Sequence, residues 1–450
     1  MAFAWNAASA AHLHRRAGFG ASAEQIEQDV KRGFEKTLAS LLKPDKPLGK
    51  PGKKTFNDLP RLQAWWLARL VKGKHPLHDR LTLFWHNHFA TAQSKVQDLR
   101  WMHQHVATLH DLAFGDFRLL LDAVAKDPAM LVWLDNHENV ADDINENFAR
   151  ELMELFTTGT HDAAEQPNYT EDDVIAVARA FTGWGLRDGE FYFDADEHDF
   201  GLKTFKGVTS DYDGGDIMDL LVADPVTARR LSKKLWSHFA FPVELEDPLL
   251  DDMVVVYQQS GRSIAAMVEF IFRHDAFWSD EARRALVKGP AEWFTSALRL
   301  LGARPRKDHP YEIGGAVAAM GQSLFNPPSV FGWDEGLAWL ATSGVLERAS
   351  TSEWIADARD KYAPVKFQAI KLMGKPKEWA AMDAAAVVDL VLSALDLTEA
   401  DPATVAQLQA YAAADSEGAP QPVVVDEDFI DLKVRGLIAL VLSSPEWQMA

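Results

Sequence analysis

Helical periodicity runs through almost all of this 450-residue chain and constrains its fold more than any other feature. Apolar residues recur three and four positions apart in one segment after another, which is the pattern of helices with one buried face. Asp224–Pro225 is a typical N-cap and first-turn pair, and Pro290 opens a segment that ends near Gly302. The sequence therefore predicts a mainly α fold. Helices are expected near residues 23–31, 34–42, 59–72, 77–92, 104–113, 115–126, 146–157, 171–182, 224–239, 290–301, 335–349, 352–372, 384–396, 402–413 and 430–442.

One region, residues 188–208, interrupts the helical pattern. The β-prone residues FYF (191–193) and TF (204–205) flank the polar stretch DADEHDFGLK, which favours a small β-hairpin or loop insertion. The chain shows no internal repeat and no heptad pattern. We therefore expect a multi-helix single module. Residues 1–350 would form its main helical domain, with the insertion, and residues 351–450 a C-terminal helical segment packed on it.

Composition narrows the classes of function. Hydrophobic residues make up 47% of the chain, which is enough for a substantial core. The formal net charge is −20 and no run of basic residues occurs, so we expect no nucleic-acid partner, because phosphate binding needs clustered Lys and Arg. The absence of Cys excludes thiol catalysis, disulfides, iron–sulfur clusters and Cys-based zinc sites.

The sequence also bears on location. No segment has the length and apolarity of a membrane span, so we expect no membrane insertion. The first residues, MAFAWNAASAAHLHRRAGFG, are amphipathic and differ from a signal peptide. The cytoplasm is therefore the default location that the sequence indicates.

The densest set of polar side chains at helical spacing lies between residues 145 and 184. The segment reads NENFARELMELFTTG, a short acidic connector, and then YTEDDVIAVARAFTGWG. At 100° per residue, one face of the first helix holds Asn147, Arg150, Glu151 and Glu154. This mixture of amide, guanidinium and carboxylate groups without Lys suits a hydrogen-bonded site. The alternative is a solvated face on which Arg150 pairs with Glu146 or Glu154 along the helix.

The segment WHNHF (85–89) suggests a metal site at first sight. Its apolar spacing predicts a helix, on which His86 and His88 point about 200° apart, so one metal ion cannot bind both. We expect His88 to be a hydrogen-bonded histidine of the core and His86 to be exposed.

Two further places carry candidate catalytic groups. The acidic loop DADEHDFG (194–201) has oxygen ligands for a divalent cation but lacks the regular spacing of an EF-hand-type loop, so the sequence identifies no cofactor. His198, oriented by a neighbouring carboxylate such as Asp199, is a chemically reasonable general base. Asp135 follows the apolar LVWL and is either a catalytic carboxylate at the end of a buried element or a cap for the next helix.

Long segments of the chain match a bacterial family in order. They are HLHRRAGFGAS (12–22), RLTLFWHNHFAT (80–91), the two segments between 145 and 184, HDFGLKTFKG (198–207), GGDIMDLLVADPVTARRLSKKLWSHF (214–239), SLFNPPSVFGW (323–333) and LSSPEWQ (442–448). In these segments the chain resembles the family known as domain of unknown function 1800. The resemblance implies a largely helical single module but no reaction. It also implies a sulfatase-like neighbour, often encoded beside the family, that commonly carries a twin-arginine export signal. Co-export with that neighbour to the periplasm is therefore the alternative to a cytoplasmic location.

Two functions agree with these observations. The first is a hydrolase-like enzyme that acts on a polar polymer such as an envelope polysaccharide, with aromatic residues available to stack on sugar rings. Its candidate catalytic residues are Glu151, Glu154, His198, Asp199 and Asp135, and its candidate substrate-binding residues are Asn147, Arg150, Arg179, Lys203 and Trp184. The second is a non-catalytic partner or assembly factor for the sulfatase-like neighbour. We predict that one cleft holds Asn147, Arg150, Glu151 and Asp135 together with His198 or Lys203. An open pocket there would favour the first function, and a buried, fully hydrogen-bonded network would favour the second.

Overall fold

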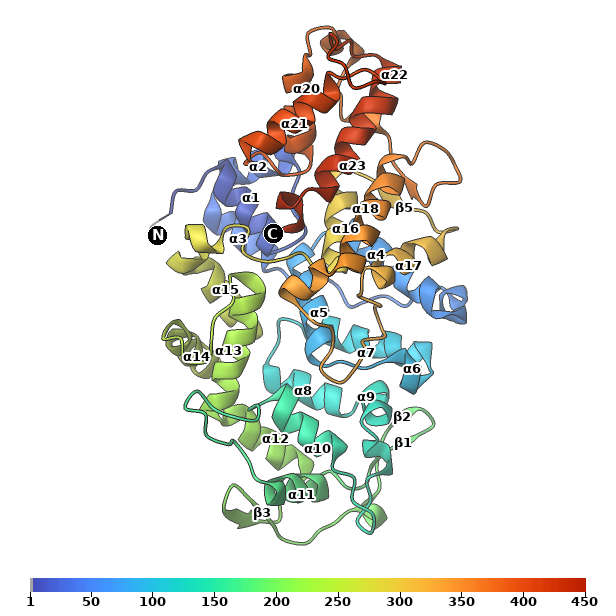
Figure 1. Ribbon diagram of the computed structural model, residues 1–450. Helices are drawn as coiled ribbons and strands as arrows, with labels where there is room; N and C mark the ends of the chain where they lie inside the picture. Colours follow the sequence, from blue (N-terminus) through green and yellow to red (C-terminus); the bar gives the residue numbers. More distant parts are fainter. Residues whose placement is uncertain (1–2) are drawn as a thin grey trace.

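A computed structural model describes residues 3–450 and confirms a mainly α fold with a small β insertion (Figure 1). The helices before the insertion are α1 (Ala7–Arg16), α2 (Ala23–Arg32), α3 (Phe34–Leu41), α4 (Leu59–Lys72), α5 (Pro76–His88), α6 (Gln93–Val96), α7 (Leu99–Asp111), α8 (Phe117–Ala125), α9 (Pro128–Trp133), α10 (Asn147–Glu151) and α11 (Glu171–Ala180). Those after it are α12 (Gly214–Ala223), α13 (Pro225–Phe239), α14 (Leu249–Gln259), α15 (Ile264–Arg273), α16 (Pro290–Leu300), α17 (Pro310–Ala319), α18 (Thr342–Ala356), α19 (Pro376–Trp379), α20 (Ala384–Ala394), α21 (Pro402–Ala412), α22 (Glu427–Phe429) and α23 (Arg435–Ser443).

The buried hydrophobic side chains form two cores. The first is built mainly from α1, α3, α5 and α8 to α15, and the second from α4 and α16 to α23. Figure 1 shows α8 to α14 in the lower part of the molecule and α16 to α23 in the upper part, with α4 beside α16 and α17 despite its early place in the chain. Helix α7 joins the two cores, because Leu109 packs in the first and Met102 and Val106 pack in the second.

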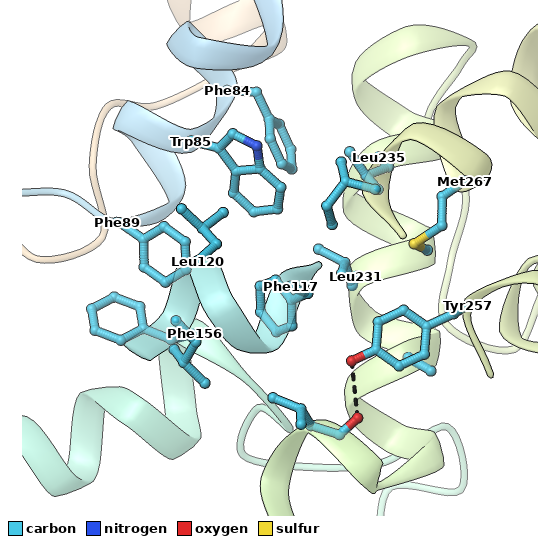
Figure 2. Close-up of a cluster of buried hydrophobic side chains, with 14 of the residues drawn as sticks. Phe84, Trp85, Phe89, Phe117, Leu120, Phe156, Leu231, Leu235, Tyr257 and Met267 are labelled. Atoms are coloured by element: carbon cyan, nitrogen blue, oxygen red, sulfur yellow. Dashed lines mark hydrogen bonds between the residues drawn. The ribbon is translucent and has the colours of Figure 1, made fainter. Parts of the chain in front are cut away.

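Aromatic side chains fill the centre of the first core, shown in Figure 2. The rings of Trp85, Phe89 and Phe117 stack in pairs at centroid distances of 5.7 to 6.4 Å. The hydroxyl of Tyr257, whose ring is buried, donates a hydrogen bond of 2.9 Å to the carbonyl oxygen of Val222. Each fully buried large side chain of this kind stabilises the fold by roughly 1.5–3 kcal/mol, so this core rigidly supports the helices that carry the polar residues.

The insertion consists of two short hairpins. Strand β1 (Trp184–Arg187) pairs with β2 (Glu190–Phe193), and β3 (Lys203–Phe205) pairs with β4 (Val208–Ser210), both antiparallel. The first turn, Asp188–Gly189, has positive φ at both residues, 56° and 83°. This backbone matches the right-handed twist of the flanking strands, and Asp-Gly favours it. The insertion therefore begins slightly before the expected residue 188 and extends slightly beyond 208.

One expected helix, over residues 352–372, is wrong. Helix α18 ends at Ala356, and Val365–Lys366 instead forms strand β6, which pairs with β5 (Arg304–Pro305). Pro364 gives the physical reason, because it disfavours the helical conformation at the residue before it and has no N–H to donate. The apolar spacing of this segment reflects packing against the second core rather than a helix.

Candidate functional site

Four of the predicted residues, Asp135, Asn147, Glu151 and Glu154, lie on or against one face of α10 and the π-helical turn Leu152–Phe156 that continues it. We call these residues the carboxylate cluster. Asp135 follows α9 in the left-handed region, at φ 57°, a strained conformation that is common at functional sites. Its carboxylate lies 2.7 Å from Lys95 Nζ and accepts a hydrogen bond of 3.2 Å from Asn147 Nδ2. Glu151 lies four residues, about one helical turn, beyond Asn147 and therefore on the same face of the helix.

Arg150 borders the carboxylate cluster and holds three carboxylates. Its guanidinium lies 3.1 Å from Glu146, 3.7 Å from Glu154 and 2.8 Å from Glu171 of α11. The pairing along the helix that the alternative of a solvated face predicts therefore occurs, and Glu171 adds a link to the next helix. Glu154 also accepts a hydrogen bond from the hydroxyl of Tyr169. These contacts fix Glu154 between a cation and a hydroxyl donor.

Glu151 differs from its neighbours because no hydrogen bond or ion pair to its side chain occurs among residues 3–450. Burial, and then the negative charge of Glu154, raise the pKa of the Glu151 carboxyl to about 7, against the opposing effect of Arg150. Two nearby carboxyl groups in such different surroundings can hold different protonation states at neutral pH. This is the electrostatic arrangement that acid–base chemistry needs.

A chain of cations continues from the carboxylate cluster into the protein. Arg230 of α13 donates a hydrogen bond of 2.7 Å to the carbonyl oxygen of Leu155 in the π-helical turn, and burial lowers its pKa to about 10 although Glu154 opposes the shift. One turn later, Lys234 Nζ lies 2.9 Å from His88 Nδ1. Burial, and then Arg230, lower the pKa of Lys234 to about 7. The sequence alone does not point to Lys95, Tyr169 or Arg230. Lys95 and Arg230 contact segments that lie far away in the chain, and Tyr169 lies before α11, outside the helical pattern.

The other predicted residues form a second group, which we call the hairpin-loop network: Arg179, His198, Asp199 and Lys203. Arg179 Nε donates to Asp199 Oδ2 at 2.6 Å, and Lys203 Nζ donates to the carbonyl oxygens of Asp199 and Gly201 at 2.6 and 3.1 Å. The His198 ring donates through Nδ1 to the carbonyl oxygen of Thr182 at 2.8 Å. These bonds fasten the HDFG loop to the end of α11.

The two groups do not share a hydrogen bond or an ion pair within residues 3–450, although α11 contacts both α10 and β3. The N-terminal end of α11 reaches Arg150 through Glu171, and its C-terminal end reaches Asp199 through Arg179. Trp184 belongs to neither group, because it is buried between the rings of Phe181 and Phe191 with Lys126 Nζ 5.4 Å from its ring centre. The structure thus places the candidates in two networks linked by one helix.

The prediction for one of the two histidines of WHNHF is confirmed, and the prediction for the other is wrong. His88 is buried and hydrogen-bonded, as expected. His86 was expected to be exposed and is instead fully buried, where its Nε2 accepts a hydrogen bond of 3.1 Å from the backbone N–H of Phe325. The expectation was wrong because the segment 321–335 covers this side of α5, a long-range contact that helical spacing cannot show.

Residues 3–450 contain no group of three or more His, Asp or Glu side chains arranged to hold a metal ion, and no described helix is long and apolar enough to cross a membrane. The model of one family, described as a protein of unknown function (DUF1800), matches residues 12–449. The match spans nearly the full length, so the chain belongs to this family. No curated protein and no solved structure matches the chain.

Proposed function

We propose that the protein is a hydrolase-like enzyme that acts on a polar polymer such as an envelope polysaccharide, with the carboxylate cluster as its catalytic site. The observation that carries this proposal is Glu151, a carboxyl group without a hydrogen-bond partner among the described residues whose pKa is raised to about 7 by burial and by Glu154. A carboxylic acid that keeps its proton near neutrality suits a general acid.

Glycosidic hydrolysis generally uses two carboxyl groups, and we assign these roles to two members of the carboxylate cluster. Glu151 would donate its proton to the oxygen of the leaving group. Asp135, paired with Lys95 and oriented by Asn147, would remove a proton from the attacking water. Glu154, held by Tyr169 and Arg150, would support the raised pKa of Glu151. The hairpin-loop network would position the adjacent loop.

The test is the release of reducing ends from purified envelope polysaccharides by the full chain. We expect Glu151→Gln, which keeps the shape but cannot give up a proton, to slow the reaction by about 10²–10⁴-fold. Glu138→Gln is the matched control, because its carboxylate is exposed and lies outside the carboxylate cluster. Unchanged activity of Glu151→Gln, or no turnover of neutral, acidic and amino-sugar polymers by the wild type, would contradict the proposal.

A second candidate is a binding role towards the sulfatase-like neighbour, and the insertion favours it. Phe200, Leu202 and Val208 are exposed by 67%, 66% and 59%, and exposed apolar residues that gather on one element mark interaction surfaces. The hairpin-loop network holds this loop in place, and the exposed acidic residues beside it, Asp196 and Glu197, favour a partner with basic residues around an apolar centre.

Co-purification and cell fractionation test this second candidate. We expect the doubly substituted Phe200→Ser, Leu202→Ser protein to lose binding to the neighbour, whereas Leu440→Ser, an exposed leucine on α23, keeps it. If the neighbour carries the protein across the membrane, the wild type appears in the periplasm only when the neighbour is present. Equal binding by both variants, or a cytoplasmic location in every strain, would count against this role.

A further inference from the structure

A cavity of about 450 Å³ lies between the N-terminal helices and the end of α16, and it shares no lining residue with the carboxylate cluster. We call it the N-terminal cavity. Its walls come from α1 and the segment after it, from α2 and α3, from the start of α5 with the loop before it, and from the last two residues of α16. Sites for small ligands usually have volumes of about 300–1,000 Å³. Most side chains that line this cavity are polar or charged, which indicates a polar ligand.

Arg299 is a fixed cation of the N-terminal cavity. Its Nη1 donates to the carbonyl oxygens of Leu70 and Gly73 at 2.9 Å each, which holds the guanidinium against the end of α4. Its Nε and Nη2 make no hydrogen bond within residues 3–450, and neither nitrogen is sealed from solvent. Arg299 therefore offers free donors of fixed position to the cavity that it lines. A planar guanidinium of this kind suits the binding of phosphate oxygens.

Lys74 brings a second cation to the same end of the cavity. The carbonyl oxygen that holds Arg299 belongs to Gly73, the residue before Lys74. The side chain of Lys74 is exposed and makes no hydrogen bond or ion pair within residues 3–450. It lines both the N-terminal cavity and an adjoining hollow of about 690 Å³. An ammonium group on a flexible stem can close on an anion that Arg299 holds.

Asp29 is the only carboxylate among residues 3–450 that lines the cavity, and its charge is already compensated. It accepts hydrogen bonds of 2.9 Å from His14 Nε2 and 2.6 Å from Gln25 Nε2. The guanidinium of Arg32 lies 2.9 Å from its other oxygen. The side chain of Arg32 is 41% exposed, so its remaining donors stay available to a ligand. Asp29 therefore uses only part of the positive charge that faces the cavity.

The carboxylates that lie near the cavity without lining it do not remove this surplus. Asp79 attracts the charge of Arg299, but burial raises the pKa of this carboxyl to about 7, so it carries only part of a negative charge at neutral pH. The other carboxylates of the surrounding elements are partnered: Glu24 with Gln28, Glu27 with Lys31, Glu35 with Arg273, Asp45 with Arg69, Glu292 with Arg80 and Asp396 with Arg15. Arg299 and Lys74 make no ion pair within residues 3–450. Two cations therefore lack a fully charged partner.

We propose that the N-terminal cavity binds a small phosphate ester, whose phosphoryl group accepts hydrogen bonds from Arg299 and Lys74. The phosphoryl dianion supplies the negative charge that these two cations lack. Arg32 and the exposed hydroxyl of Ser40 face the cavity from α2 and α3 and suit a hydroxylated body. The net charge of the chain is −20, so an anion is attracted here by the local cations and not by the protein as a whole. The site does not depend on the hydrolysis proposed for the carboxylate cluster.

Titration calorimetry of the full chain with glycerol 3-phosphate, inorganic phosphate, acetate and glycerol tests the ligand class. We expect glycerol 3-phosphate to bind with a Kd below about 1 mM and to raise Tm. Inorganic phosphate should bind more weakly because it lacks the body, acetate should bind at least about tenfold more weakly than phosphate, and glycerol should not bind. Absence of glycerol 3-phosphate binding, or acetate binding as tight as that of phosphate, would overturn the proposal. Tighter binding of inorganic phosphate than of the ester would overturn the assignment of an ester.

Substitutions at exposed positions test the location. We expect Lys74→Gln to weaken glycerol 3-phosphate binding by at least about fivefold. Lys72→Gln is the matched control, because Lys72 is exposed two residues earlier and lines only the adjoining hollow. Equal losses in the two variants would mean general attraction by surface charge and would overturn the site.

Filling the cavity gives a second test that leaves the charges unchanged. Ser40 lines the cavity and is exposed on α3, so we expect Ser40→Trp to fold, as checked by circular dichroism, and to abolish binding of glycerol 3-phosphate. Ala39→Trp is the control, because Ala39 is also exposed on α3 but does not line the cavity. Unchanged affinity in a folded Ser40→Trp protein would overturn the location. If Ser40→Trp does not fold, the comparison of Lys74→Gln with Lys72→Gln still decides it.

Discussion

Glu151 makes the stability of the protein depend on pH. Its folded-state pKa of about 7 lies above its ordinary value of 4.5. Its contribution to stability is therefore complete below about pH 4.5 and is lost as the pH rises through 7, where the buried group must ionise. We predict that Glu151→Gln gains stability relative to the wild type between pH 5 and pH 8. Chemical denaturation at both pH values checks this. Glu138→Gln is the control, because its effect on stability should be the same at both pH values. If the difference in stability between Glu151→Gln and the wild type does not change with pH, the pKa of Glu151 is not raised.

Arg150 and Phe148 are neighbours with very different expected contributions. Phe148 is buried in the first core, so Phe148→Ala should cost about 2–5 kcal/mol through the cavity that it leaves. Arg150 pairs with partly exposed carboxylates and keeps a third of its own surface in solvent, so Arg150→Ala should cost less than about 1 kcal/mol. Urea denaturation of both variants measures the two losses. Comparable losses would mean that Arg150 anchors a network more tightly than its exposure suggests.

At the level of single residues, the sequence predicted contacts between residues that are close to each other in the chain. The pairs of Arg150 with Glu146 and Glu154 follow from helical spacing and occur. The pairs Lys95–Asp135 and Lys234–His88 join residues on different elements, and no periodicity in one sequence shows such a contact. The same reason explains why His86 was expected to be exposed.

Among the elements, the junction between α11 and the insertion depends on Gly183. Its φ is 75°, and a Cβ there would lie 2.3 Å from the carbonyl oxygen of Asp194. We predict that Gly183→Ala lowers the free energy of unfolding by at least about 2 kcal/mol, because both backbone strain and the clash must be accommodated. Gly207 has a similar φ of 77° with open space around it, so Gly207→Ala should cost only about 1 kcal/mol. If Gly183→Ala and Gly207→Ala lower the stability equally in thermal denaturation, the predicted clash with the carbonyl oxygen of Asp194 does not destabilise the fold.

Two elements show why helical spacing alone misplaces boundaries. The helix expected over 146–157 exists, but it changes to a π-helical turn at Leu152–Phe156, where Arg230 binds a free carbonyl oxygen. The contact comes from α13, so the local pattern of the sequence does not show it. The expected helix over 352–372 is wrong for a local reason, because Pro364 cannot donate a backbone hydrogen bond and disfavours the helical conformation at the residue before it.

At the scale of the whole molecule, the two cores are predicted to unfold together. Helix α7 packs in both, and the segment 321–335 is fastened to α5 through His86 and Asn87. We expect a single transition in urea when circular dichroism and tryptophan fluorescence are followed in parallel. Two separated transitions would show that the cores are independent units.

The fold class and the family membership were predictable, because both rest on long segments of sequence. The division of the predicted site into a carboxylate cluster and a hairpin-loop network was not, because it depends on which ends of α11 meet α10 and β3.

The central claim is that Glu151 retains a proton near neutral pH in the folded protein. Carbon-13 NMR of the full chain labelled at the Glu side-chain carboxyl, with the signal of Glu151 assigned by its loss in Glu151→Gln, measures this directly. The structure leads us to expect a titration midpoint of about 7 for Glu151 in the wild type and a lower midpoint in Glu154→Gln, which removes the neighbouring negative charge. A midpoint near 4.5 in the wild type, unchanged in Glu154→Gln, would contradict the assignment of Glu151 as the general acid.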